Sequence, residues 1–393
     1  MKSAQKLWTS KERVRAALRH EEPDCVPVGE TGIDAHITER ILGRRTHYRG
    51  GWWSQIASWE GRAAEVMESH KRDMVELYTK LDYDVVPVFL GADVSMARAV
   101  EVKRIDDETV EVSGVRYVLS SQTNKYVAVK SSYPAQDFTQ WKEGPPYQSP
   151  SDAQWELFDH CVSHLGDRFL LARDLGGFFH GDEAFLMACY DHPGIIARMN
   201  AYACEHDCRR AQDFIRHGAD AVFIGGDYCD SRSPMISPAK FRELIFPWLK
   251  ELCAAIHKAG GYAVKHTDGH TWPLLDMFAE AGVDILHAIQ PSAGMDIKKM
   301  KKRYGKTFTF LGAIDCDTLV RGTPEQIRNE VDYNLRWASP GGGHILCSGN
   351  TIQYGVPFEN FMAMLGRLRE KGSYPIDFQG LHPQSVYEQA RAS

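Results

Sequence analysis

Short apolar runs alternate with longer amphipathic stretches along most of the chain. The runs are rich in Val, Ile, Leu and Phe, and several end in Gly or a charged residue, which is typical of strands buried on both faces. The stretches between them have the periodicity of helices that cover a sheet. Eight segments have the strand pattern: 24–32, 83–91, 168–177, 220–228, 262–269, 283–291, 307–316 and 343–350.

Helix signals follow most of these runs. A helix is expected over 237–261, because Ser237 can cap it and Pro238 suits the first helical position. Another long helix is expected to end at Gly218. This helix covers 194–218, and the remaining predicted helices cover 59–80, 271–282, 296–305, 323–339 and 357–372.

The segment 98–132 breaks this alternation. Apolar and polar residues alternate along it, with turn signals at Asp106-Asp107 and Ser113-Gly114. This pattern predicts a meander of antiparallel strands, inserted after the second strand as a lid or an edge.

Eight strand–helix units over this length favour a closed (β/α)₈ TIM barrel of the α/β class over an open doubly wound sheet. We expect residues 1–393 to form one barrel domain that contains the insertion 98–132. In such barrels the functional site lies at the carboxyl ends of the strands.

Composition narrows the function classes. The 393 residues are 43% hydrophobic and 25% charged, with a formal net charge of −6, so nucleic-acid binding is disfavoured. No apolar run reaches the length of a membrane helix, and the N-terminal segment lacks the core of a signal peptide. The nine cysteines have no disulfide-framework spacing, which indicates a reduced, cytoplasmic protein.

Ionisable and amide side chains gather at the predicted strand ends. Facing one mouth, they would form a polar pocket rich in acids, His and Cys. The residues are Glu30, Asp93, Arg173, Asp174, Asp227, Tyr228, His266, Asp268, His287, Gln290, Asp315, Cys316, Cys347 and Asn350.

His266, Asp268 and Cys347 form a candidate metal site. Residues i and i+2 of a strand share a face, so His266 and Asp268 can bind one ion from the fifth strand, and Cys347 ends the eighth. His, thiolate and carboxylate are zinc ligands, and three of them leave a position open for catalysis. The alternative is a hydrogen-bonded His–Asp pair and a buried cysteine. The residues alone favour this alternative over the metal site.

Two other motifs bear on metal binding. The segment "CEHDC" (204–208) lies within a predicted helix, away from the mouth, so we interpret it as helix surface and core. Cys316, at the end of the seventh strand, is a spare ligand should Cys347 not serve.

The segments "GGDY", "KHTDG", "GAID" and "GGGHILCSGNTIQYGVPFENF" together resemble the uroporphyrinogen decarboxylase superfamily. The resemblance covers about residues 160–372 well and the first 95 more loosely, and it implies the same barrel. True decarboxylases of this superfamily carry an arginine-rich signature after the first strand, which clamps porphyrinogen carboxylates. The segment "VPVGETGIDAHI" has no arginine there, which argues against a porphyrinogen substrate.

The resemblance extends to the corrinoid-dependent methyltransferases of this superfamily. Members that methylate coenzyme M bind zinc through H-x-C on the fifth strand and a Cys on the eighth. This chain has His266-Thr267-Asp268 and Cys347 at the matching places. The resemblance therefore implies zinc, with Asp268, Glu30 and Gln290 as alternatives for the third ligand. A carboxylate in place of a thiolate leaves zinc harder, which suits an ether or phenolate oxygen.

We therefore expect an O-demethylase component that moves a methyl group from a methoxylated aromatic to Co(I) of a separate corrinoid protein. Asp227, Tyr228 and Glu30 are the candidate acids for the leaving phenolate. Arg173, His287, Gln290 and Asn350 are the candidate substrate-binding residues. A homodimer is compatible with this interpretation.

Three alternatives remain. One is a cofactor-free decarboxylase, which an arginine cluster in the mouth would favour. Another is a second-step methyltransferase that acts on a thiol or tetrahydrofolate, and the missing H-x-C counts against its thiol version. The third is a binding barrel without catalysis, which the many ionisable groups at the strand ends disfavour.

Overall fold

The main sheet has seven parallel strands in sequential order. The structure is a computed structural model that describes residues 8–129, 137–176 and 179–388. Each strand pairs with the next strand of this sheet, and the predicted runs contain all seven. The strands are β1 (Val85–Val88), β6 (Phe169–Leu175), β7 (Ala221–Ile224), β8 (Tyr262–His266), β9 (Ile285–His287), β10 (Thr309–Leu311) and β11 (His344–Ile345).

The first predicted strand, 24–32, joins the two edges of this sheet. It makes isolated parallel bridges, with Val28 opposite Leu346 and Gly29 opposite Val85. The Gly29 N–H donates to the Leu346 carbonyl at 3.1 Å, and the Val85 N–H donates to the Val28 carbonyl at 3.1 Å. The sheet is therefore closed, which confirms the predicted (β/α)₈ barrel.

Alternate strand residues fill the barrel interior. They pack with Val14 and Ala17 of α1 (Ser10–Leu18). The Ala17 carbonyl accepts from the Gly343 N–H, just before β11, so α1 covers the amino ends of the strands. Helix α1 does not cover the opposite end, at the carboxyl termini of the strands, where the functional site is expected. The strand residues of this interior cluster are Val85, Phe169, Leu171, Ala221, Phe223, Val264, Ile285, Leu311 and Ile345, and Cys347, two residues after β11, joins them.

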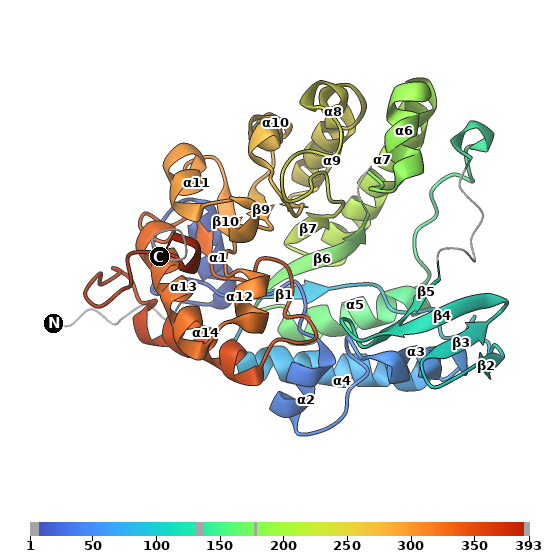
Figure 1. Ribbon diagram of the computed structural model, residues 1–393, viewed down its shortest axis with the longest axis horizontal. Coiled ribbons are helices and arrows are strands. Elements are labelled where there is room, and N and C mark those ends of the chain that lie inside the picture. The colour runs from blue at the N-terminus through green and yellow to red at the C-terminus, as the bar shows by residue number, and fades with distance from the viewer. Residues whose placement is uncertain (1–7, 130–136, 177–178, 389–393) are drawn as a thin grey trace.

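Helices surround the barrel (Figure 1). The predicted helix 237–261 is two helices, because Pro247 has no N–H to continue the first one. No helix in the described part of the chain is long and apolar enough to cross a bilayer. The surrounding helices are α4 (Ala63–Leu81), α5 (Asp152–Leu165), α7 (Pro193–Arg216), α8 (Pro238–Leu244), α9 (Phe246–Lys258), α10 (Leu275–Ala281), α11 (Ile297–Tyr304), α13 (Pro324–Trp337) and α14 (Phe358–Lys371).

Several short elements lie in the connections and had no clear periodic pattern. The Asp315 carboxylate accepts from the N–H groups of Asp317 and Thr318, so this predicted strand-end residue caps a helix. The short elements are α2 (Ala35–Leu42), α3 (Trp52–Trp59), η2 (Phe138–Gln140), α6 (Glu183–Asp191), η3 (Trp272–Leu274), η4 (Pro291–Ala293) and α12 (Cys316–Arg321).

The predicted meander is an antiparallel four-stranded sheet that lies beside α3 (Figure 1). Ser113 and Gly114, with φ of 50° and 79°, form the two-residue turn between its second and third strands. Residues 130–132 of the predicted insertion and residue 177 of the predicted third strand lie outside the described residues. The strands of the inserted sheet are β2 (Val102–Arg104), β3 (Thr109–Val112), β4 (Val115–Ser120) and β5 (Lys125–Ala128).

Candidate active site

The end of β8 carries the centre of the candidate site. Val264 packs in the barrel interior, so His266, two residues later, follows it on the inward side. Lys265 lies on the other side, and its buried ammonium donates to the carbonyls of Gly225 at 2.6 Å and Gly226 at 2.8 Å. Lys265 thereby holds the loop after β7 against β8. No motif in the sequence pointed to this role of Lys265.

Three ligand-type side chains meet at this point. One ligand atom each of Asp227, His266 and Asp268 lies within 4.8 Å of the others. The Asp227 Oδ1 is 3.6 Å from the His266 Nε2 and accepts from the Asp268 N–H at 3.0 Å. The Asn350 amide donates to the Asp268 Oδ2 at 2.7 Å. Strands β7 and β8 and the segment after β11 therefore build one cluster.

The electrostatics of this cluster fit a divalent cation. Burial, with Asp227 close by, raises the pKa of Asp268 to about 7. Burial, with Lys265 and Arg173 nearby, lowers the pKa of His266 to about 3, so the imidazole is neutral. A neutral imidazole and two adjacent carboxylates form a zinc-type donor set, and a cation would relieve the repulsion between the carboxylates.

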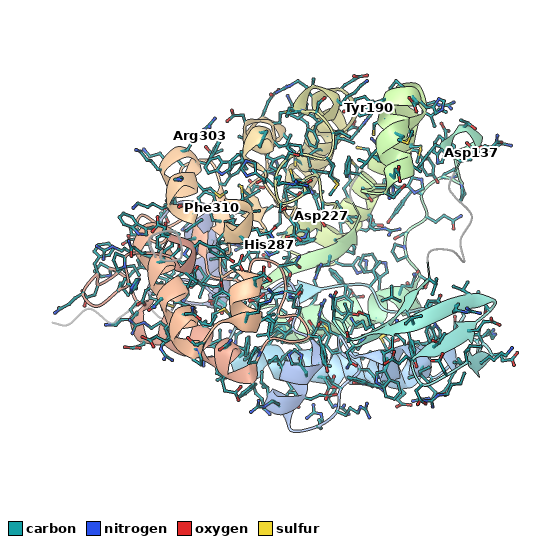
Figure 2. All side chains as sticks on the ribbon, in the orientation of Figure 1. Asp137, Tyr190, Asp227, His287, Arg303 and Phe310 are labelled. Atoms are coloured by element: carbon teal, nitrogen blue, oxygen red, sulfur yellow. The ribbon has the colours of Figure 1, made fainter. Side chains whose placement is uncertain are left out.

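Behind His266 runs a buried hydrogen-bonded chain. The Nδ1 atoms of His266 and His287 are 2.8 Å apart, and the His287 Nε2 is 3.9 Å from the Cys347 sulfur. The Cys347 thiol contacts the Glu30 Oε2 at 3.4 Å, and the Ser348 hydroxyl donates to the same oxygen at 2.6 Å. This chain orients the His266 ring and can leave its Nε2 as the ligand atom. Asp227 and His287 lie near the centre of the molecule in Figure 2.

The predicted metal set is thus only partly assembled. His266 and Asp268 come together as expected, but their third neighbour is Asp227. Cys347 is fully buried in the interior cluster, where burial and Glu30 raise the pKa of its thiol well above the ordinary value. The place of Cys347 near the end of a strand correctly predicted that it lies toward the carboxyl end of the barrel. It could not predict how deeply the side chain is buried.

Among the predicted acids, Tyr228 points elsewhere. It is 1% exposed and packs against Phe179, Phe241 of α8 and Phe278 of α10. Its hydroxyl lies in the layer between barrel and helices, so we correct its assignment as an acid. Side chains on opposite sides of a strand exit reach different layers, and Asp227 takes the side that faces the mouth.

Other predicted residues have structural partners. The Gln290 Oε1 accepts from the Gly269 N–H at 2.9 Å, so it braces the turn after β8. With Asp268, Cys316 and Asn350 it lines a small cavity of about 140 Å³. Asp93 accepts from the hydroxyls of Ser95 and Ser151 and does not line the large cavity described next. The side chain of Asp174 lies outside the described residues.

A cavity of about 810 Å³ opens beside His266, within the range of small-molecule sites. Its wall combines strand ends β6 to β8 with α3, α4, β5 and the segment 47–50. Among its described lining residues none is acidic, while three are cations and three are Tyr or Phe. These residues are Arg49, Lys125, Arg173, Tyr48, Phe89 and Phe223.

Arg173 takes the predicted place in this mouth. Its guanidinium donates to the Thr31 carbonyl and lies over the Phe223 ring, 4.6 Å from the centroid. Arg49 and Lys125 were not among the predicted site residues, because neither follows a barrel strand. No local signal marked Lys125, which belongs to the inserted sheet.

Comparison with known proteins identifies the family. The profile of uroporphyrinogen decarboxylase (URO-D) matches residues 175–371, half of the chain. The chain belongs to the URO-D family. It is 27% identical over 150 residues to the chloroplastic uroporphyrinogen decarboxylase of Nicotiana tabacum, and 26% identical over 161 residues to that of Psychromonas ingrahamii. These matches cover 38% and 40% of this chain, and 37% and 43% of the relatives.

A solved structure is similar over nearly the whole chain. It is a methyltransferase from Methanosarcina mazei, with a TM-score of 0.64 and 19% identity. The similarity covers 93% of this chain and 99% of that one. At this identity the likeness establishes the fold, which this member of the URO-D family therefore shares with an enzyme described as a methyltransferase.

Proposed function

We propose that this URO-D family member is a methyltransferase that moves a methyl group from a methoxylated aromatic to the Co(I) of a corrinoid carried by a partner protein. The observation that carries the proposal is the Asp227–His266–Asp268 cluster at the carboxyl end of the barrel, beside a cavity with aromatic walls. The fold shared with a methyltransferase supports the same reaction class.

The proposed methyl transfer is a nucleophilic substitution at the methyl carbon. The electron pair of Co(I) attacks the methyl carbon, a cobalt–carbon bond forms, and the carbon–oxygen bond breaks with its electrons on the phenolate. The phenolate then takes a proton from solvent. Zinc held by Asp227, His266 and Asp268 would act as a Lewis acid toward the leaving oxygen.

The surrounding residues prepare the site for this step. His287 fixes the His266 ring, and Asn350 holds one oxygen of Asp268. Tyr48 and Phe89 stack at 6.2 Å with an interplanar angle of 9°, and both line the cavity. Aromatic walls of this kind suit a planar ring.

A cofactor-free decarboxylase is the second candidate. It is supported by the cations Arg49, Lys125 and Arg173 in the cavity and by the curated relatives. The segment 26–37, which spans the end of the first predicted strand and the residues after it, has no arginine, which counts against a porphyrinogen substrate.

The two candidates give different products. The purified protein, supplied with zinc, is incubated with a panel of methoxylated aromatics and chemically reduced cob(I)alamin. We expect the Co(I) spectrum to convert to that of methyl-Co(III), with release of the phenol, and we expect His266→Ala to abolish the conversion. Carbon dioxide release from carboxylated compounds without methyl-Co(III) would favour the decarboxylase. No methyl-Co(III) across the panel would refute the methyltransferase.

A further inference from the structure

We propose that the large cavity contains an anion subsite, in which Lys125 of the inserted sheet and Arg49 bind a carboxylate-class group on the donor. Methoxylated aromatic carboxylates would then be preferred over neutral methoxylated aromatics. The identity of the reaction rests on the proposed function, but the binding of the anion does not.

The backbone around Lys125 is clamped to α3. The Trp52 N–H donates to the Asn124 carbonyl at 2.8 Å. The Gln55 side chain donates to the Tyr126 carbonyl at 3.0 Å and accepts from the Tyr126 N–H at 2.7 Å. Both neighbours of Lys125 are therefore fixed, and its side chain lines the cavity.

A glycine makes this clamp tight. A Cβ added to Gly51 would lie 2.7 Å from the Asn124 carbonyl oxygen. Real Cβ atoms do not come this close, so a side chain at position 51 would push the turn of the inserted sheet away from α3. The close approach of these two segments brings Lys125 to a cavity whose other walls belong to the barrel.

No described residue forms an ion pair with the Lys125 ammonium, and Asp34 acts on it only through its charge. Lys125 is half-buried, and among the described residues its Nζ has no hydrogen-bond partner. Burial, reinforced by Arg49 and opposed by Asp34, lowers the pKa of Lys125. Holding a partly desolvated cation unpaired is unfavourable, and a bound anion would supply the missing partner.

Arg49, the second cation of the proposed anion subsite, is also held in a fixed position. Its Nε donates to the Asp34 Oδ1 at 2.8 Å, and the Tyr354 N–H holds the other Asp34 oxygen at 2.8 Å. Gly32 leaves room for the guanidinium, because a Cβ there would lie 2.6 Å from the Arg49 Nη1. Asp34 offsets one positive charge, and no acidic side chain appears among the described residues that line the cavity.

A donor in this cavity can contact both the barrel and the inserted sheet. The lining includes His266 and the strand ends, residues of α3 and β5, and the rings of Tyr48 and Phe89. A ring along these aromatic side chains can direct its methoxy group to the metal cluster and its carboxylate to Lys125. The inserted sheet would then determine which donors are accepted.

Calorimetric titration of the full-length protein tests the subsite without any methyl transfer. The probes are 3-methoxybenzoate and the neutral 3-methoxybenzamide, which have similar shapes. We expect the protein to bind the benzoate at least tenfold more tightly than the amide. Lys125→Met should remove this preference by weakening benzoate binding, with the affinity for the amide unchanged. Arg49→Met should also reduce the preference for the benzoate over the amide.

Two control variants sharpen the result. Lys103→Met removes an exposed lysine from β2 of the same sheet and should retain the full preference. His266→Ala should also retain it, since the carboxylate binds the cations and not the metal. Equal binding of the two probes, no binding of either, or an unchanged preference in Lys125→Met would overturn the subsite. Normal benzoate preference with no methyl-Co(III) would refute the proposed reaction and leave the subsite intact.

Discussion

At the scale of single residues, buried polar groups shape the candidate site. The Lys265 ammonium is fully buried, where burial lowers its pKa to about 7, and it lies 4.0 Å from the centroid of the Tyr228 ring. Its bonds to the Gly225 and Gly226 carbonyls fix the chain just before Asp227. The carboxylate of Asp227 can therefore meet His266 although half of its side chain is exposed to solvent.

The zinc content of variants distinguishes two candidate ligand sets. The sequence predicted His266, Asp268 and Cys347, and the structure brings together Asp227, His266 and Asp268. His266→Ala and Asp268→Ala remove ligands common to both sets and should each abolish stoichiometric zinc. Asp227→Ala should also abolish it, while Cys347→Ala should retain it, because the sulfur lies with Glu30 and His287. Metal analysis by mass spectrometry after dialysis measures this. The reverse outcome for Asp227 and Cys347 would restore the set expected from the sequence.

A buried acid outside this cluster predicts a pH effect on stability. Burial, with Asp315 and Glu388 nearby, raises the pKa of Glu330 to about 7 from an ordinary value near 4.5. Below pH 4.5 both folded and unfolded states are protonated. Between about 4.5 and 7 the unfolded state releases a proton that the folded state keeps, so the stability falls as the pH rises.

Glu330→Gln should therefore stabilise the protein at pH 8 relative to wild type, by up to about 3 kcal/mol. The amide oxygen can still accept from the Val386 N–H, which now bonds to the Glu330 Oε1. Urea unfolding at pH 5 and pH 8 measures the effect. A stability difference between variant and wild type that is the same at both pH values would contradict the assignment.

At the scale of elements, the segment before β1 completes the barrel with very little regular pairing. Val28 and Gly29 connect the two edges of the sheet by single bridges. A Cβ at Gly29 would lie 2.5 Å from the Val85 Cβ, closer than real side chains pack. The absence of a side chain at position 29 is what allows the two segments to meet.

Gly29→Ala should therefore destabilise the protein by about 1–3 kcal/mol, in the range of overpacked cores. Gly366→Ala is the matched control. Gly366 lies inside α14, and beyond the backbone of that helix no atom of the described residues lies within 4 Å of an added Cβ, so alanine there should be neutral or stabilise by up to about 1 kcal/mol. Urea denaturation followed by circular dichroism compares the two variants. Equal stability of both would refute the tight closure.

At the scale of the whole molecule, the barrel and the inserted sheet have separate interiors. The two hydrophobic core clusters contain no described residue of β2 to β5. The insertion is joined to the barrel side chiefly through α3, where Trp59 packs on Tyr117 and Tyr126. The chain carries a net charge of −6, and yet its large cavity is lined by cations.

Replacement of residues 101–129 by a flexible Gly-Ser linker should leave a folded barrel. We expect cooperative thermal unfolding and stoichiometric zinc, because the core and the Asp227–His266–Asp268 cluster lie outside the insertion. Binding of 3-methoxybenzoate should fall to that of the amide, since Lys125 is lost. Thermal melts, metal analysis and calorimetry provide the three measurements. Loss of cooperative unfolding would show that the barrel depends on the inserted sheet.

Much of the fold could be predicted because its signals are local. Runs of buried residues located the seven strands of the sheet and the segment that closes it, and alternation with turn residues located the inserted meander. The pairing of His266 with Asp268 also came from a local rule, the two-residue period of a strand. The break at Pro247 was missed, because the helical pattern continues across it. The short helices in the connections were missed, because loops carry little periodicity.

The sequence by itself determined the barrel, the end at which its polar residues gather and two members of the candidate metal cluster. Only the tertiary structure decided that Asp227 joins them while Cys347 lies deeper, and that Arg49 and Lys125 line the same cavity. The reason is physical. Strand periodicity acts over neighbouring residues, whereas side-chain depth and the docking of an inserted sheet depend on contacts between segments far apart in the chain.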